Sequence, residues 1–201
     1  MSLSRFVGRL GVPSAAMTRK VILGMAVSVD GFIEGPNREI DWHWVDAEVH
    51  QYFNDDLGTR GAFLSGRVTH ELMASVWPTA DQDPDADPQM AEFAGIWRDM
   101  PKIVYSRTLA RADWNTTIVR EVVVDEVKAL KGQPGGDLSL GGADLAAAFM
   151  RHDLIDEYRL YVNPVVIGAG KPMFQGARMD LRLVENRTFG NGVVMLRYER
   201  P

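Results

Sequence analysis

The feature that most constrains the fold is a continuous apolar run near the start of the chain, VILGMAVSV at residues 21–29. The run is rich in β-forming residues and lacks the polar–apolar alternation of a half-exposed strand, which is typical of a strand buried on both faces of a sheet. Such a strand requires helices packed on either side, as in α/β proteins with a mainly parallel sheet.

The rest of the chain alternates between short β-rich segments and amphipathic helices, and it ends in two segments separated by a Gly-Asn-Gly turn, a strong hairpin signal. We therefore predict an α/β protein of three layers, with a mainly parallel central sheet and an antiparallel C-terminal hairpin. The predicted strands are 21–29, 61–65, 102–105, 116–119, 137–140, 157–167, 181–189 and 193–198, and the predicted helices are 46–57, 66–76, 88–99, 123–131 and 143–152.

Two helices carry clear local signals. Asp46 is a favourable N-cap for the first, and Gly58 is a favourable stop. In the second, Val68, Leu72 and Val76 recur at four-residue spacing, which predicts that they form its core-facing stripe.

Composition narrows the class of protein. The 201 residues are 46% hydrophobic and 24% charged, which suits one globular domain at 20–201, preceded by an extension at 1–19 that we expect to be disordered. The net charge of -5 comes without any dense basic stripe, so we expect small-molecule partners and no nucleic acid. No apolar run approaches the roughly 20 residues that span a bilayer, so we expect no membrane association.

Metal and thiol chemistry find little support. The chain has no cysteine, which excludes disulfides and thiol catalysis and is compatible with a reducing compartment, so we expect a cytoplasmic protein. The four histidines lack tight ligand spacing. Alternating aspartates at 81–87 invite a calcium interpretation, but the prolines, the missing central glycine and the missing final glutamate oppose an EF-hand. We predict no metal site.

Three strand-to-helix or strand-to-loop turns carry phosphate-binding chemistry: Gly66-Arg67, Ser106-Arg107 and Gly141-Gly142. Glycine lets a ligand approach the backbone, the free N–H groups of a helix start attract anions, and guanidinium groups suit phosphate. Each turn alone is also an ordinary tight turn. Because the carboxyl ends of parallel strands share one edge of a sheet, we expect the three turns to form one nucleotide site.

The order of these motifs identifies a family resemblance. The chain resembles the dihydrofolate reductase fold, and more closely the bacterial relatives of the reductase domain of the riboflavin-biosynthesis deaminase-reductase. The matching pieces are AVSVDGFI (26–33), FLSGRVTHE (63–71), KIVYSRTL (102–109), LSLGGADLAAAF (138–149) and DEYRLYVNPVVIGAGKPMF (156–174).

This resemblance implies an NADPH-binding reductase that forms a homodimer. The pyrophosphate and ribose would lie at the first and third turns, the 2′-phosphate and adenine at the second, and the nicotinamide beside the first strand. The cofactor-binding residues implied are Ala26, Ile33, Gly66, Arg67, Thr69, Ser106, Arg107, Gly141, Gly142 and Leu145.

The reaction implied is hydride transfer to a C=N or C=O carbon with delivery of a proton. The candidate acids are Asp30, Asp46 and Glu48. Asp30 matches the SxDG pattern of the riboflavin-type relatives, but it could equally end a strand. Asp46 and Glu48 stand at a helix start, where a capping or dipole-complementing acid is an ordinary explanation.

The substrate pocket is expected beside an aromatic group and a facing loop. The segment 39–56 lacks the basic residues with which the riboflavin enzymes hold a phosphorylated substrate, and the deaminase zinc motifs are absent. The substrate class therefore stays open among pterin-, pyrimidine- and riboflavin-precursor-like molecules, and an NADPH-binding module without turnover is the alternative. The predicted substrate-binding residues are Trp42, Trp44, Tyr52, Trp77, Pro164, Gly168 and Phe174.

Overall fold

The computed structural model describes residues 18–201, so the predicted N-terminal extension lies almost wholly outside the described residues. Its main feature is an eight-stranded sheet with the order β5-β4-β3-β6-β1-β7-β10-β9. The strands are β1 (Val21–Ser28), β3 (Ala62–Gly66), β4 (Lys102–Tyr105), β5 (Thr116–Val119), β6 (Leu138–Gly141), β7 (Glu157–Asn163), β9 (Arg182–Thr188) and β10 (Val194–Glu199).

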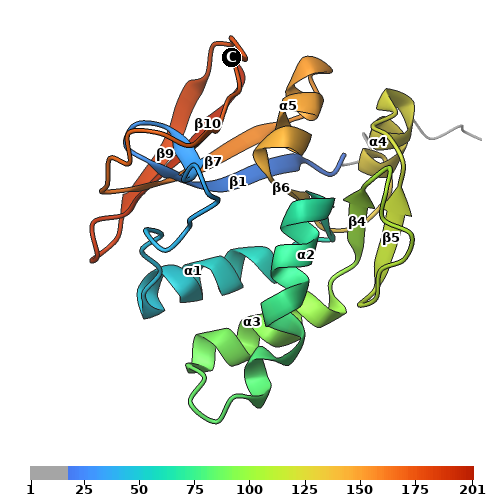
Figure 1. The fold of residues 1–201 in the computed structure, drawn as a ribbon. Coiled ribbons are helices and arrows are strands. Elements are labelled where there is room, and N and C mark those ends of the chain that lie inside the picture. Colours follow the sequence, from blue (N-terminus) through green and yellow to red (C-terminus); the bar gives the residue numbers. More distant parts are fainter. Residues whose placement is uncertain (1–17) are drawn as a thin grey trace, which may run out of the picture.

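Neighbouring strands from β5 to β7 pair in parallel, whereas β10 is antiparallel to both β7 and β9. Helices cover both faces (Figure 1), with α1, α2 and α3 on one side and α4 and α5 on the other. The predicted three-layer fold with its antiparallel C-terminal hairpin is confirmed. The helices are α1 (Ala47–Leu57), α2 (Arg67–Val76), α3 (Pro88–Asp99), α4 (Val124–Lys131) and α5 (Ala143–Arg151), with a 3-10 turn η1 (Trp77–Gln82) after α2.

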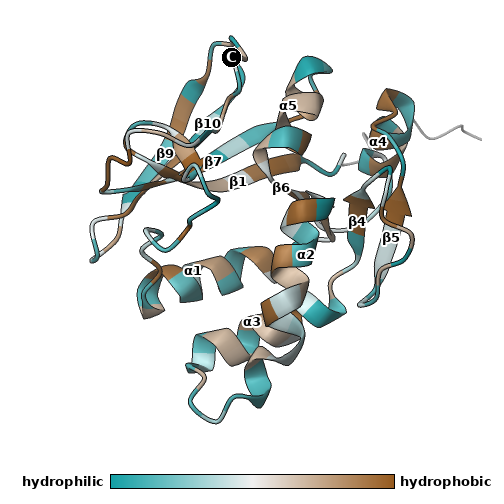
Figure 2. Ribbon diagram, in the orientation of Figure 1, coloured by the Kyte–Doolittle hydropathy of each residue, from teal (hydrophilic) through white to brown (hydrophobic). Residues whose placement is uncertain are grey.

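The apolar run at the start of the chain forms β1, between β6 and β7. Val21 and Leu23 are fully buried, and Ile22 is 3% exposed, as expected for a strand covered on both faces. Hydrophobic residues recur in β4, as Ile103 and Val104, and in the second half of β5, as Ile118 and Val119 (Figure 2). Asp46 caps α1 by accepting a hydrogen bond from the backbone N–H of Val49, as predicted.

The predicted core stripe of α2 is wrong. Val68, Leu72 and Val76 are 42%, 49% and 43% exposed. The side of the helix that faces the protein carries His70, which is buried and stacks on Trp97 of α3 at 6.2 Å between ring centroids. A four-residue spacing identifies a stripe, but the packing partner decides which stripe turns inward.

A second, two-stranded sheet was not predicted, because both of its segments read as loops. It joins β2 (Phe32–Glu34) to β8 (Lys171–Pro172) in antiparallel pairing. The predicted strand at 157–167 is correspondingly shorter and ends at Asn163. No helix within residues 18–201 has the length and apolar character needed to cross a membrane.

Candidate functional site

A pocket of about 710 Å³ opens at the carboxyl ends of strands β3, β4, β5 and β6. All three predicted turns reach it: Gly66 ends β3 and Arg67 follows it, Ser106 and Arg107 follow β4, and Gly142 follows β6. Parallel strands bring their carboxyl ends to the same edge, so residues far apart in sequence share one cavity.

Two helices begin at this pocket. Gly66 is the N-cap of α2 and Gly142 is the N-cap of α5, and neither helix start has a side-chain cap. The first residues of both helices line the cavity, including Val68, Thr69 and Leu145. Uncapped N–H groups and the positive ends of two helix dipoles therefore converge on the same space, which favours a negatively charged ligand.

Gly142 is the position at which this arrangement depends on glycine. Its φ is 92°, and a Cβ there would meet Thr69 Oγ1 at 2.7 Å. We expect Gly142→Ala to lower the free energy of unfolding by about 1–3 kcal/mol, because it adds backbone strain and a clash. The matched control is Gly66→Ala, where φ is -80° and an added Cβ meets nothing within 4 Å. Denaturant unfolding of both variants measures the difference, and equal stability would contradict the expectation.

Cations outnumber acids around the pocket. Its lining includes Arg38, Arg67, Arg107, Arg120, Arg151 and Lys171, against Glu34, Glu121 and Asp144. Arg67 pairs with Glu71 at 2.8 Å, and Lys171 pairs with Asp144 at 2.6 Å. Within the described part of the chain, the other four arginines form no ion pair with a carboxylate. The cavity therefore carries an excess of positive charge.

One end of the pocket is a loop fixed by its own hydrogen bonds. The Arg120 guanidinium donates to the carbonyl oxygens of Ser106 at 2.9 Å and Leu109 at 2.7 Å. Ser106 Oγ accepts the backbone N–H of Leu109 at 2.9 Å. These contacts fix the loop that carries Arg107, whose exposed side chain lines the pocket. Sequence reasoning missed Arg120, although it directly follows the predicted strand 116–119 and the strand-end rule applies to it.

Asp144 is the one acid in the first turn of α5, where it could repel an anion. Its carboxylate instead accepts hydrogen bonds from Lys171 at 2.6 Å and Gln175 at 2.8 Å. Partial burial alone would raise the pKa of Asp144, but the bonds from Lys171 and Gln175 outweigh it and lower the pKa. Lys171 thus neutralises the acid beside the pocket.

Most of the predicted cofactor-binding residues meet in this cavity. Gly141 ends β6 next to it, and Ala26 lies within β1 opposite Tyr161 on β7, so neither of these two lines the pocket. The predicted residues that do line it are Ile33, Gly66, Arg67, Thr69, Ser106, Arg107, Gly142 and Leu145. The lining residues that were not predicted are Glu34, Arg38, Val68, Tyr105, Arg120, Glu121, Val122, Ala143, Asp144, Ala148, Arg151, His152 and Lys171.

The three candidate acids lie outside the lining of the pocket, each in a hydrogen bond. Asp30 accepts the backbone N–H of Gly168 at 2.8 Å, and a hydrogen bond from Ser28, aided by backbone N–H groups, lowers the pKa of Asp30. Asp46 caps α1. Glu48 accepts the backbone N–H of Gly190 at 2.9 Å. Their catalytic role stays a prediction.

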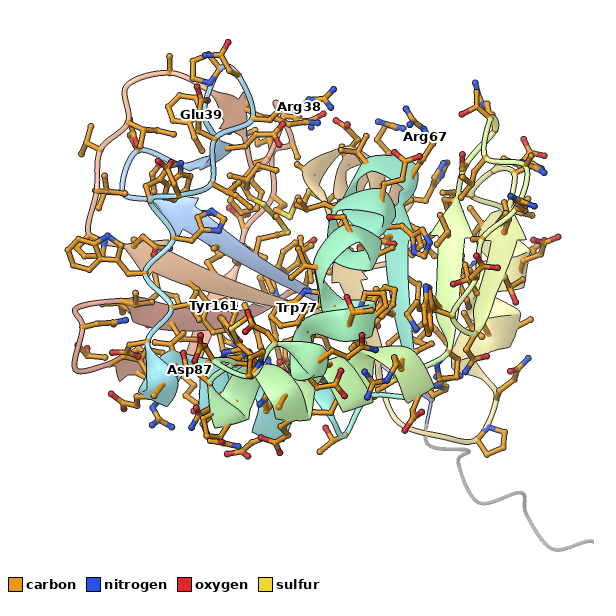
Figure 3. All side chains as sticks on the ribbon, turned by 60° about the horizontal axis from the view of Figure 1, so that its bottom comes forward. Arg38, Glu39, Arg67, Trp77, Asp87 and Tyr161 are labelled. Atoms are coloured by element: carbon orange, nitrogen blue, oxygen red, sulfur yellow. The ribbon has the colours of Figure 1, made fainter. Side chains whose placement is uncertain are left out.

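The structure separates the predicted substrate-binding residues. Trp77 packs edge-on against Phe93 at 4.6 Å, and Tyr52 packs against Phe189 at 5.3 Å, in two different clusters. Figure 3 shows Trp77 well away from the rim where Arg67 projects. The others are Trp42 and Trp44 in the loop before α1, Pro164 and Gly168 in the loop after β7, and Phe174, which packs on the main core. None of the seven lines the pocket.

Fold and site together place the chain among the α/β proteins of the dihydrofolate-reductase-like class. More narrowly, the family model of the RibD C-terminal domain matches residues 19–195, and the chain belongs to that family. Two uncharacterized proteins of Bacillus subtilis (strain 168) are similar. YyaP is 38% identical, with 90% of this chain and 94% of YyaP covered. YwjB is 31% identical, with 92% of this chain and 99% of YwjB covered.

Solved structures show the same fold. A putative riboflavin biosynthesis protein from Shewanella sp. PV-4 matches with a TM-score of 0.69 at 21% identity, over 90% of this chain and 99% of that one. A deaminase/reductase of Thermotoga maritima matches with a TM-score of 0.63 at 14% identity, over 92% of this chain but only 57% of that one. A pyrimidine reductase-like protein from Corynebacterium diphtheriae matches with a TM-score of 0.59 at 12% identity, over 90% of this chain and 91% of that one. Membership of the RibD C-terminal domain family supports a reductase role.

Proposed function

We propose that this protein is an NADPH-dependent reductase that transfers a hydride to a C=N or C=O group of a small heterocyclic substrate, of pterin, pyrimidine or riboflavin-precursor type. One observation carries the proposal: two uncapped helix starts share one cavity at the strand ends with four arginines that form no ion pair with any carboxylate of residues 18–201. Such a cavity suits a ligand with several phosphate groups.

The residues present fit this cofactor along the length of the pocket. The backbone at Gly66 and Gly142, with Thr69 between the two helix starts, would hold the pyrophosphate. Arg107 and the loop held by Arg120 would bind the 2′-phosphate, a dianion that needs cations beyond helix N–H groups. Ile33, which is buried, would exclude water beside the nicotinamide ring.

The bound cofactor would supply the hydride, and the chain would supply orientation and a proton. Asp30, Asp46 and Glu48 are the proposed sources of that proton, directly or through water. The pyrimidine reductase-like and riboflavin biosynthesis relatives support a heterocyclic substrate. A homodimer and a cytoplasmic location belong to the same proposal.

The test is a titration of the intrinsic tryptophan fluorescence with NADPH and NADH, followed by steady-state oxidation of NADPH with candidate pterins, pyrimidines and riboflavin precursors. We expect tighter binding of NADPH and faster oxidation with one substrate class. Absence of binding for both nucleotides would overturn the proposal. Binding without any substrate-dependent oxidation would favour the alternative, an NADPH-binding module such as a sensor or sequestering protein.

A further inference from the structure

The loop between β2 and α1 places an arginine in a backbone conformation usually left to glycine. The backbone N–H of Arg38 donates to the carbonyl of Gly35 at 3.0 Å, and the N–H of Gly35 donates to the carbonyl of Glu39 at 2.9 Å. Pro36 and Asn37 form the corners of this tight turn. Arg38 follows them with a φ of 68°, in the left-handed region. A turn followed by one left-handed residue is a common loop design, but glycine normally fills that position.

The strained conformation is fixed by the loop itself. Glu39 accepts hydrogen bonds from the backbone N–H of Asn37 at 2.8 Å and from its side-chain amide at 2.7 Å. The hydrogen bond from the side-chain amide of Asn37, together with hydrogen bonds from backbone N–H groups, lowers the pKa of Glu39. The carboxylate is therefore charged at neutral pH and stabilises the turn. A left-handed arginine costs about 1–2 kcal/mol relative to ordinary backbone, and such strain is characteristic of functional sites.

The arginine is aimed at the cofactor pocket. Arg38 lines the cavity, and it is close enough to Asp144, in the first turn of α5, to contribute to lowering the pKa of that carboxyl. Figure 3 shows Arg38 and Arg67 on the same rim, coming from the loop after β2 and from the start of α2. Arg67 is paired with Glu71, whereas Arg38 has no ion pair in the described chain.

We propose that Arg38 is a cofactor-binding residue whose guanidinium binds the diphosphate of the dinucleotide from the rim of the pocket that it shares with Arg67. This inference rests on the proposed function, since it assigns a further residue to the same site. The backbone N–H groups at the two helix starts would bind the diphosphate, and the guanidinium of Arg38 would add a positive charge to them. The left-handed backbone of Arg38 follows the tight turn and leaves its side chain in the lining of the pocket.

The experiment compares Arg38→Gly with the wild type in nucleotide binding and in stability. Glycine adopts the left-handed conformation without strain. We therefore expect Arg38→Gly to raise the denaturant midpoint while weakening NADPH binding by about tenfold, the loss of one charge-assisted hydrogen bond. If Arg38 had a purely structural role, its replacement would not raise stability and weaken NADPH binding at the same time. Arg178→Gly, at an exposed arginine outside the pocket, is the control and should leave NADPH affinity unchanged.

A second ligand locates the contact. Adenosine 2′-monophosphate lacks the diphosphate, so its affinity should be the same for wild type and Arg38→Gly. Equal weakening of both ligands, or unchanged NADPH binding in the variant, would overturn the inference while the proposed function stands. Failure of the wild type to bind NADPH would overturn both, and the wild-type titration therefore separates the two failures.

Discussion

Replacing Asp56 by alanine is expected to lower the free energy of unfolding by about 3 kcal/mol, because it strips a shared counter-ion from two buried arginines. Asp56 lies in the last turn of α1, and its carboxylate accepts hydrogen bonds from Arg60 Nη2 at 2.5 Å and from Arg159 Nη1 at 2.5 Å. The side chains of Arg60 and Arg159 are only 5% and 12% exposed. The carboxylate thus fastens helix α1 to strand β7 across the interface between two layers.

The charges are strongly interdependent. Burial alone would lower the pKa of Arg159, but Asp56 and Glu157 more than offset it and raise the pKa. Without Asp56, Arg159 keeps its 2.6 Å contact with Glu157, whereas Arg60 keeps only a 3.7 Å contact with Asp137. Because the contact with Asp137 is weak, the desolvation cost of the buried Arg60 would be largely uncompensated. We therefore expect a large loss in the free energy of unfolding.

Asp55→Ala provides the matched control for this experiment. Asp55 is exposed on the same turn of α1, and its carboxylate accepts one hydrogen bond from Gln51 at 3.1 Å. Its loss should change stability by less than about 0.5 kcal/mol. Urea unfolding of the two variants measures the contrast. A change below 1 kcal/mol for Asp56→Ala would show that the arginines relax into solvent at little cost.

The parts of the fold that sequence reasoning predicted are those with local signals. Strands β1 and β3 are apolar runs that end shortly before Asp30 and at Gly66, and the two ends of α1 are marked by Asp46 and Gly58. The turns at Gly66 and Ser106 were correctly predicted to meet, because a parallel sheet gathers its carboxyl ends at one edge. Periodicity and topology together were sufficient for this much of the site.

The parts it missed depend on contacts between distant segments. The predicted inward stripe of α2 did not include His70, yet His70 is buried and stacks on Trp97 of α3. The pairing of β2 with β8 brings Lys171 to the pocket, but β8 is only two residues long and leaves no pattern in the sequence. The edge-on packing of Trp77 against Phe93 of α3 likewise depends on two segments that are separate in the sequence, and the substrate role of Trp77 stays a prediction. No single segment encodes such neighbours.

The most informative binding prediction concerns Arg107, which projects from the loop that Arg120 holds. NADPH differs from NADH by a 2′-phosphate, and one guanidinium–phosphate hydrogen bond contributes about 1.5–3 kcal/mol. Arg107→Ala should therefore weaken NADPH binding by roughly 10- to 100-fold and leave NADH binding unchanged. Arg111→Ala, at an exposed arginine nearby in sequence that does not line the pocket, should change neither affinity.

We also expect Arg107→Ala to change how the preference for NADPH over NADH depends on salt concentration. The contact between the exposed Arg107 and a dianion is screened as ionic strength rises, so the NADPH preference of the wild type should fall between about 0.01 and 0.15 M salt. Arg107→Ala should lose most of that salt dependence together with the preference. Fluorescence titrations of both nucleotides at two salt concentrations measure this. An equal loss of NADPH and NADH affinity would instead mean that Arg107 contacts the part common to both, and the 2′-phosphate assignment would then pass to Arg120 or Arg151.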